Sequence, residues 1–339
     1  MKPQQKNRDF SIDTLRCIGL FCIILAHVAP PNWLFQIRNF DVPLMVFISG
    51  YLYRGKQDNL STITEQLAYL GKRFVRLVIP VWAFLTFFYL IQLYFPSLFT
   101  INYTLYPSIM LSSYLLMDGF GYVWIIRIFL LMALLGPLCM KFFKKPINLL
   151  YYYIGYELFY YLLKNKINSP STNLFNEIVG YTAGFLVFFI LGSLYNKLSR
   201  GQIKAIFAVS TIITIGAALY FIGYKNEPFN IGDYKYPPRL FYTQYAIVIC
   251  FLLFYAKSYL GNFRSNLVAF IGSSSIWIYL WHIMFLFLIP KIHWGPRFIL
   301  VFSLAMLISY LQQQLVNFLI RISGCSEAWS KQIRIIFCS

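Results

Sequence analysis

The sequence predicts an all-α integral membrane protein with about ten transmembrane helices. Three observations lead to this prediction: 59% of the 339 residues are hydrophobic, 20% are aromatic and only 12% are charged. A soluble chain of this size has too little interior to bury so much apolar surface, whereas a polytopic membrane protein exposes it to lipid. The net charge of +18 does not indicate nucleic-acid binding, because the basic residues lie in short segments between apolar runs and form no single patch.

Ten apolar runs are the predicted spans, and the charges around them indicate their orientation. The runs cover residues 14–31, 40–53, 77–95, 122–140, 147–163, 177–196, 203–224, 240–256, 267–289 and 298–320. With the N-terminus inside, the inner segments hold 20 of the 29 lysines and arginines, and the outer loops hold 8. Basic residues concentrate on the cytoplasmic side, so we expect both termini in the cytoplasm and a multi-pass protein of the inner (plasma) membrane. We expect one transmembrane domain over residues 1–339, with no appended soluble domain.

Residues 101–117 are an ambiguous apolar segment. Asn102 and Pro107 interrupt it, so we expect an outer re-entrant or interfacial piece, not a further span. A span here would reverse every later segment and place the lysines of residues 141–145 outside, against the charge distribution. The six cysteines of the chain fall in predicted spans or inner segments, and we expect them to be reduced thiols.

The first span contains Arg16 and His27 and is the most informative element for function. Eleven helical steps of about 100° separate the two residues, so they lie on one face, about 16 Å apart along the axis. Arg16 is therefore expected at the inner interface and His27 near the midplane of the bilayer. Ionisable side chains at such depth are costly and usually mark a reaction centre or a pathway. Ser11 or Asp13 is expected to cap this helix.

Both residues also have a purely structural interpretation. His27 can be a hydrogen-bonded core histidine, and Arg16 can be an interfacial anchor that pairs with Asp13 on the same face. The functional interpretation is that an imidazole takes a proton from a hydroxyl during acyl transfer, or accepts the acyl group itself.

The second and third spans add further candidates. Ser49 and the glycine that follows it permit close helix approach, and Tyr51 comes directly after them. Lys72, Arg73 and Arg76 precede the third span. Such inner basic residues can act only as topology determinants, but they also provide a cytoplasmic surface for phosphate groups.

Three later residues have two interpretations each. Trp124 begins the fourth span and is either an interfacial aromatic residue or part of a site. Arg127, one turn further on, needs a partner, which Asp118 or Glu157 can provide. His282, in the ninth span, is a core histidine or a site residue.

Together, these motifs resemble membrane-bound acyltransferase family 3, which contains O-acetyltransferases that act on bacterial surface glycans. The matching elements, in chain order, are Ile12-Asp13-x-Leu15-Arg16 with His27 after ten residues, Val42-Pro43-Leu44, Phe47-x-Ser49-Gly50-Tyr51, Lys72-Arg73-x-x-Arg76-x-x-x-Pro80, Trp124, and Tyr279-Leu280-x-His282. They extend over most of the chain, and their common order makes the match specific. The chain departs from the family in one respect. Members often have a histidine two residues before the tryptophan, where this chain has Tyr122, which is uncharged at neutral pH.

The resemblance implies a reaction and a set of site residues. Arg16 and His27 would form the catalytic centre, and Lys72, Arg73 and Arg76 would bind the phosphates of a cytoplasmic acyl-CoA, most simply acetyl-CoA. The residues expected to contact substrate are Asp13, Ser49, Tyr51, Tyr122, Trp124, Tyr279, His282 and, in the polar outer loop 225–239, Arg239. We expect acyl-CoA as donor co-substrate, no permanently bound cofactor and no metal.

The expected acceptor is a hydroxyl of an extracytoplasmic surface glycan or lipid-linked saccharide, and the expected surroundings are membrane lipids. The predicted activity is therefore that of an O-acyltransferase, an enzyme. A transporter or flippase for lipid-linked glycans is the alternative, because it would also need intramembrane cations and a re-entrant outer segment. A third hypothesis is a structural partner in a glycan-assembly complex, which would tolerate substitution of Arg16 and His27.

Overall fold

Every regular element among the described residues is a helix. The structure is a computed structural model that describes residues 8–54, 62–100, 103–167 and 175–338. The chain forms two compact units. The first comprises Met1–Pro30 with Leu252–Ser339, and the second comprises Pro31–Phe251. The all-α class predicted from the sequence is confirmed, while a single domain over residues 1–339 stays a prediction.

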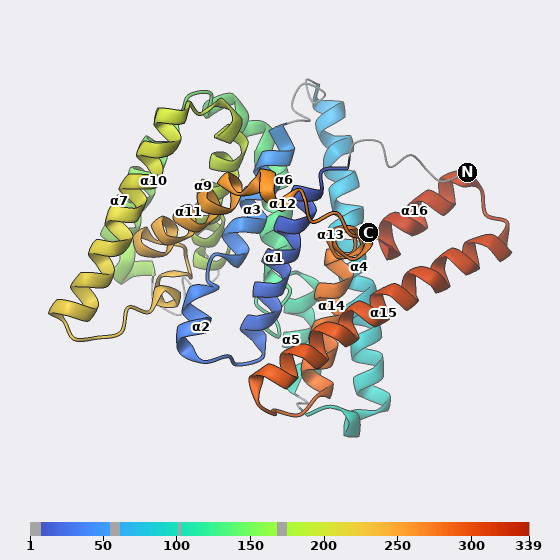
Figure 1. Cartoon of the computed structure of the whole chain (residues 1–339). Coiled ribbons are helices and arrows are strands. Elements are labelled where there is room, and N and C mark those ends of the chain that lie inside the picture. The colour runs from blue at the N-terminus through green and yellow to red at the C-terminus, as the bar shows by residue number, and fades with distance from the viewer. Residues whose placement is uncertain (1–7, 55–61, 101–102, 168–174, 339) are drawn as a thin grey trace. The chain divides into compact units, whose positions relative to one another are not determined.

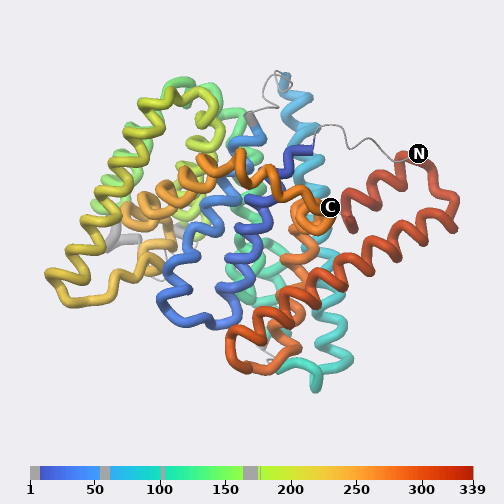
Figure 2. The backbone as a smooth tube through the Cα atoms, in the orientation of Figure 1, coloured from blue at the N-terminus to red at the C-terminus, as the bar shows by residue number. Residues whose placement is uncertain are grey.

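The first unit surrounds the N-terminal helix with helices from the C-terminal part of the chain. Its elements are α1 (Phe10–His27), α12 (Lys257–Leu260), α13 (Asn266–Ser273), α14 (Ser275–Leu288), α15 (Trp294–Ser323) and α16 (Glu327–Phe337) (Figure 1). The helix α1 contacts α12, α13, α14 and α15. The tube in Figure 2 follows the chain outward along α15 and back along α16, which packs against it.

The N-terminal cap of α1 differs from the prediction. The helix begins at Phe10, and its cap is Asp9, whose carboxylate accepts a hydrogen bond from the backbone N–H of Ser11. Neither Ser11 nor Asp13 is the cap, because both already lie within the first helical turn. Burial alone would raise the pKa of Asp9, but hydrogen bonds from Ser11 and from Lys257, 2.9 Å away, hold that pKa below its ordinary value.

The helix α14 is anchored at both ends by polar contacts. Between α13 and α14 the chain bends by 78°. At the start of α14, Gln313 of α15 donates a 2.6 Å hydrogen bond to Ser274. At its end, the buried guanidinium of Arg297 donates to the carbonyl oxygens of Leu286 and Ile289, at 3.0 and 3.3 Å. The bonds from Arg297 satisfy carbonyl groups at the C-terminal end of α14 that have no partner within the helix. The bond from Gln313 holds the start of the helix.

The second unit holds the remaining elements. They are α2 (Asn32–Ile37), α3 (Asp41–Arg54), α4 (Ile63–Tyr94), η2 (Pro96–Leu98), η3 (Tyr103–Leu105), α5 (Pro107–Tyr114), α6 (Trp124–Phe142), α7 (Pro146–Ile167), η5 (Asn176–Gly180), α9 (Tyr181–Leu194), η6 (Tyr195–Lys197), α10 (Arg200–Ala218), η7 (Leu219–Tyr224), η8 (Ile231–Tyr234) and α11 (Leu240–Tyr255). The boundary between the units falls near the end of α11.

The pair α3 and α9 forms the tightest helix contact of this unit. A Cβ atom added to Gly50 of α3 would lie 1.9 Å from the carbonyl oxygen of Phe189, and one added to Gly192 of α9 would lie 2.1 Å from that of Phe47. Glycine on each helix therefore lets the two backbones touch, as small residues do at interfaces within membranes. The expectation that the Ser49–Gly50 pair permits close approach is confirmed at Gly50.

The inner segment 54–76 is helical over its second part. The helix α4 begins at Ile63, with Thr62 and Glu65 forming a capping box in which each side chain bonds the backbone N–H of the other. Lys72, Arg73 and Arg76 therefore lie on a helix that continues without interruption into the predicted third span. A part of this segment, residues 55–61, lies outside the described residues.

Six helices among the described residues are long and apolar enough to cross a membrane. They are Phe10–His27, Ile63–Tyr94, Trp124–Phe142, Glu177–Lys197, Arg200–Tyr224 and Trp294–Ser323, and the bent pair α13–α14 makes a seventh if it is one span. Each coincides with a predicted run. The other three runs correspond to α3, α7 and α11, of which α3 and α11 have only 14 and 16 residues. The protein is thus a multi-pass membrane protein, and ten spans with cytoplasmic termini stay a prediction.

The ambiguous segment forms only short helices. Its described part holds η3 and the eight-residue α5, which is far shorter than the roughly 20 residues a transmembrane helix needs. A crossing within residues 103–117 is therefore excluded, and the re-entrant or interfacial placement stays a prediction. All six cysteines are free thiols, as expected.

We expect Gly50→Ala and Gly192→Ala to destabilise the protein by about 1–3 kcal/mol each, because the added methyl group has to push the facing backbone away. Thermal unfolding of the purified protein in detergent measures this. Gly216→Ala in α10 is the matched control: nothing lies within 4 Å of its Cβ position, so it should stabilise the helix by up to about 1 kcal/mol. Equal effects at the three glycines would contradict the packing argument.

Candidate active site

Two histidines face each other in the first unit. His27 is the last residue of α1, and His282 lies in the middle of α14, 255 residues later. The Nδ1 atom of His27 is 3.0 Å from Nε2 of His282, and the rings are stacked with centroids 5.2 Å apart. His282 is completely buried, whereas His27 is half-buried. The structure therefore brings into contact the two histidines of the first and ninth predicted spans.

A backbone contact assigns the protons of this pair. The Nδ1 atom of His282 bonds the carbonyl oxygen of Tyr279, one helical turn earlier. A carbonyl oxygen only accepts, so Nδ1 of His282 donates and its Nε2 atom is the acceptor of the neutral ring. Nδ1 of His27 then donates to that acceptor. The lone pair of neutral His27 is consequently on Nε2, which is the arrangement a general base requires.

Tyr279 contributes its ring as well as its carbonyl oxygen. The ring centroids of Tyr279 and His282 are 4.8 Å apart, and the tyrosine is buried. Tyr279 thus fixes the orientation of His282 from two sides. Both residues were expected to contact substrate, and the structure places His282 behind His27 in a chain of hydrogen bonds.

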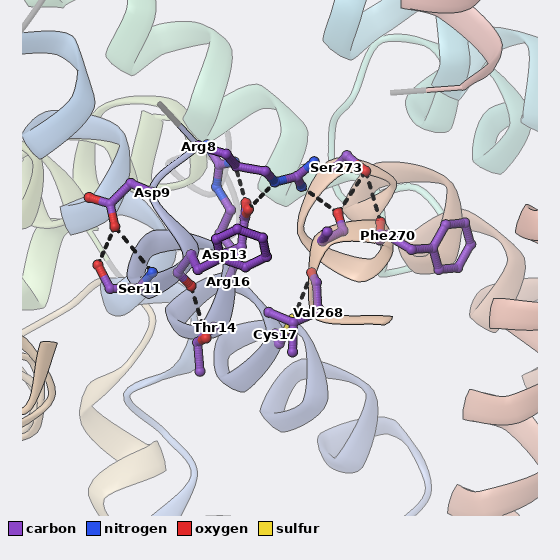
Figure 3. Close-up of polar contacts among 12 residues, drawn as sticks. Arg8, Asp9, Ser11, Asp13, Thr14, Arg16, Cys17, Val268, Phe270 and Ser273 are labelled. Atoms are coloured by element: carbon purple, nitrogen blue, oxygen red, sulfur yellow. Dashed lines mark hydrogen bonds and ion pairs between the residues drawn. The ribbon is translucent and has the colours of Figure 1, made fainter. Parts of the chain in front are cut away.

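The carboxylate of Asp13 organises the other end of α1. Asp13 is buried, and its carboxylate accepts a 2.5 Å hydrogen bond from Nε of Arg8. One guanidinium nitrogen of Arg16 lies 3.8 Å from the same carboxylate. Figure 3 shows Arg8 extending between Asp13 and α13, where it bonds the carbonyl oxygen of Ala269. The predicted Asp13–Arg16 pair is confirmed, and Arg8 is a partner that the sequence analysis did not identify.

Helix α13 approaches α1 closely at this point because it offers a glycine. A Cβ atom at Gly272 would lie 2.6 Å from Oδ1 of Asp13. Nearby, the Cys17 thiol contacts the carbonyl oxygen of Val268 at 3.6 Å (Figure 3). The Thr14 hydroxyl donates to the carbonyl oxygen of Leu260 at 3.3 Å. The face of α1 that includes Arg16 is therefore held against α12 and α13 by polar contacts.

The expected phosphate-binding residues lie near the start of α4, in the second unit. Lys72 and Arg76 are exposed, and Arg73 is half-buried. Arg73 stacks over the ring of Tyr69 at 5.2 Å and donates a 3.0 Å hydrogen bond from Nε to the hydroxyl of that tyrosine. Three cations within five residues of one helix form a concentrated, accessible basic surface, which suits a polyanionic ligand.

The remaining expected substrate contacts also belong to the second unit. Ser49 and Tyr51 are half-buried on α3, and the ring of Tyr51 lies 6.4 Å from that of Tyr195. Tyr122 packs against Phe120, with ring centroids 5.6 Å apart. Arg239 lies 4.6 Å over the ring of Tyr160. These contacts give Tyr51, Tyr122 and Arg239 a structural role.

Arg127 has a partner other than the two considered from the sequence. Its guanidinium lies 3.6 Å from the carboxylate of Glu177 and donates a 3.2 Å bond to the carbonyl oxygen of the same residue. The Nη1 atom that forms this ion pair is also 2.8 Å from the sulfur of Met117. Asp118 interacts with Arg127 only at longer range. Glu177 begins the sixth predicted span, so its closeness to the fourth span had no signal in the local sequence.

Among the described residues, no group of three or more His, Cys, Asp or Glu side chains has the geometry of a metal site. The chemistry that the site residues themselves support is proton transfer at His27, with the imidazolium stabilised by His282.

Comparison with known proteins identifies the family. The family model described as an acyltransferase domain, that of acyltransferase family 3, matches residues 9–311, which include α1, the basic surface of α4, Trp124 and the His27–His282 pair. No curated protein and no solved structure matches the chain. Because the match covers most of the chain and both of its units, the protein belongs to acyltransferase family 3, a family of membrane acyltransferases.

Proposed function

We propose that the protein is an O-acetyltransferase of the inner membrane, with ten spans and both termini in the cytoplasm. It transfers an acetyl group from cytoplasmic acetyl-CoA to a hydroxyl of an extracytoplasmic glycan or glycolipid. The observation that supports this most directly is the His27–His282 pair at the end of the apolar helix α1. In this pair, Nε2 of neutral His27 carries the lone pair that can accept a proton. Family membership supports the acyl transfer itself.

His27 acts as the general base in this proposal. Nε2 of His27 removes the proton of the acceptor hydroxyl, and the oxygen attacks the thioester carbon. The carbon–sulfur bond then breaks, and the proton passes from His27 to the departing thiolate of CoA. His282 stabilises the imidazolium in between, because its Nε2 atom accepts the hydrogen bond from Nδ1 of His27. The same nitrogen would be the nucleophile if His27 carried the acyl group covalently.

Arg16 has a role at the donor. Eleven helical steps of α1 separate it from His27, about 16 Å along the axis, which is too far for an arginine side chain to reach the reacting carbon. The carboxylate of Asp13 holds its guanidinium. We therefore assign Arg16 to orienting the acyl-CoA arm, and the basic surface of Lys72, Arg73 and Arg76 to binding the CoA phosphates.

His27→Ala should reduce acetyl transfer by roughly 10²- to 10⁴-fold, the usual contribution of a general base. Radiolabelled acetyl-CoA is supplied to membranes that contain equal amounts of folded protein, and label in the glycan fraction is counted together with CoA release. Unchanged transfer in His27→Ala would contradict the proposal. Movement of unmodified lipid-linked saccharide without CoA release would instead indicate a transporter.

His282 provides a sharper test of proton placement. His282→Ala removes the acceptor for Nδ1 of His27 and should lower kcat by roughly 10- to 100-fold. His282→Gln places an amide oxygen near the former Nε2 atom, so it should retain more activity than alanine. Equal losses in the glutamine and alanine variants, at equal thermal stability, would exclude the hydrogen-bond role. Labelling of the wild-type protein by acetyl-CoA that is lost on acid treatment, as expected for an acyl imidazole, and that is absent from His27→Ala would favour the covalent route.

Removal of the α4 cations should raise KM for acetyl-CoA and leave kcat nearly unchanged. We expect a roughly 5- to 30-fold increase for the Arg76→Gln variant, because a charge-assisted phosphate contact is worth about 1–2 kcal/mol. The effect should diminish at high salt. Lys204→Gln is the matched control, because Lys204 is an exposed cation in the first turns of α10, which is also expected on the inner side. A KM shift of equal size in the control would show that only general surface charge matters.

A further inference from the structure

A buried ion cluster in the second unit has an uncompensated positive charge. Asp41, the first residue of α3, lies 2.6 Å from a guanidinium nitrogen of Arg38 and 3.6 Å from Lys235 Nζ. The side chains of all three residues are less than one-tenth exposed. Two cations and one carboxylate leave a net charge of +1 away from water, which is costly unless an anion is supplied.

Polar atoms without a hydrogen-bond partner lie beside this cluster. They are Nε of Arg38, Oδ1 of Asn39 and the hydroxyl of Tyr242, each fully enclosed by protein. Tyr242 is within electrostatic range of Asp41 and Arg38. A buried donor or acceptor that stays unsatisfied costs about 1–3 kcal/mol, so these atoms favour a polar ligand beside the cluster.

Three aromatic rings adjoin the cluster. The Nζ atom of Lys235 lies 5.3 Å from the ring centroid of Tyr236. That ring is 5.3 Å from Trp124 and 5.5 Å from Tyr181, and the latter two are 5.9 Å apart. Tyr236 is 48% exposed, and Trp124 and Tyr181 are half-buried. The aromatic group is therefore partly exposed and reaches the buried cation through Tyr236. Exposed aromatic rings accept the apolar face of a sugar ring.

We propose that Trp124, Tyr181 and Tyr236, together with the Arg38–Asp41–Lys235 cluster, form a binding site for an acidic sugar residue of the acceptor. The rings contact the sugar, and its oxyanion, a carboxylate or a phosphate, neutralises the excess charge. This inference rests on the proposed function, because it names the chemical class of the acceptor glycan. Of these residues, only Trp124 was a candidate from the sequence.

The neighbouring charges leave the excess at the cluster in place. Arg127 is paired with Glu177 at 3.6 Å, so it neither adds to the excess nor neutralises it. Asp118 acts on Tyr236, Tyr181 and Arg127 but is not among the charges that act on Lys235 or Asp41, so it does not neutralise the cluster. A carboxylate beside aromatic rings is suited to accept hydrogen bonds from sugar hydroxyls.

Lys235 remains charged at neutral pH. Burial lowers the pKa of its ammonium to about 8; Asp41 opposes this shift, and Arg38 adds to it. At pH 7 the positive charge therefore persists and requires a counter-ion. Above pH 8 the unliganded lysine loses its proton, so an anionic sugar should bind less tightly there.

The test is equilibrium binding to the full-length protein in nanodiscs of zwitterionic lipid, without acyl-CoA. The probes are methyl β-glucuronide, glucose 1-phosphate and methyl β-glucoside, and calorimetry gives each Kd. We expect the two acidic sugars to bind roughly 10- to 100-fold more tightly than the neutral one, as expected for a hydrogen bond to a charged group. Glucuronide affinity should fall by up to about tenfold per pH unit above pH 8. Equal affinity for all three probes would overturn the proposal.

Two variants separate the parts of the site. Lys235→Met leaves the neutral Arg38–Asp41 pair, so it should abolish the preference for acidic sugars and the pH dependence while neutral-sugar binding is retained. Tyr236→Ala should weaken all three probes alike. Lys225→Met is the matched control, because this exposed lysine lies in the same loop and over a tyrosine ring, 5.8 Å away. A similar loss in the two lysine variants would overturn the proposal.

Further outcomes identify the ligand and keep the proposals distinct. Inorganic phosphate or phosphatidylglycerol that displaces the glucuronide as well as glucose 1-phosphate does would overturn the sugar assignment in favour of a bare phosphate site. If acetyl-CoA is turned over but acidic sugars are not preferred, only this inference fails. If acidic sugars bind as described and no acetyl group is transferred, the site stands and the proposed O-acetyltransferase function fails.

Discussion

Polar groups within an apolar helix bundle need partners inside the protein, and this constraint organises both units. In the first unit, His27 is satisfied by His282, which is in turn satisfied by the backbone of Tyr279. Asp13 is satisfied by Arg8 and Arg16. Each partner also fixes a proton position or an orientation that the proposed acyl-transfer mechanism uses. The polar contacts that make α1 tolerable in an apolar setting are thus the ones that would make it reactive.

In the second unit, too, buried polar groups have partners inside the protein, but here they are charged groups, whose burial costs more free energy. Arg127 pairs with Glu177, and Asp41 lies between Arg38 and Lys235. The first pair is balanced, whereas the second group has one positive charge more than its carboxylate neutralises. An imbalance of this kind is rare in an apolar setting unless the charge is used. Together with the exposed aromatic ring of Tyr236, it is the reason to place an anionic ligand there.

Glycine positions explain how such polar groups fit between closely packed helices. Gly272 gives room to the carboxylate of Asp13, and Gly50 and Gly192 allow α3 and α9 to touch through their backbones. A side chain at Gly272 would displace the carboxylate of Asp13, and one at Gly50 or Gly192 would push the facing backbone away. Close approach and polar pairing therefore depend on each other.

Local patterns in the sequence determined the helical class, six of the spans, the shared face of Arg16 and His27, and the Asp13–Arg16 pair, because helical periodicity and hydropathy act within one segment. The local patterns did not locate the N-terminal cap of α1 at Asp9, because Asp9, Ser11 and Asp13 are all suitable capping residues close to the start of the helix. Only the tertiary structure decided that His282 stands behind His27, that Glu177 pairs with Arg127, and that Asp41 and Lys235 meet. These contacts join residues about 50 to 255 positions apart in the chain or lie between different elements. They depend on how helices cross, and the periodicity of a single helix does not encode its crossing geometry.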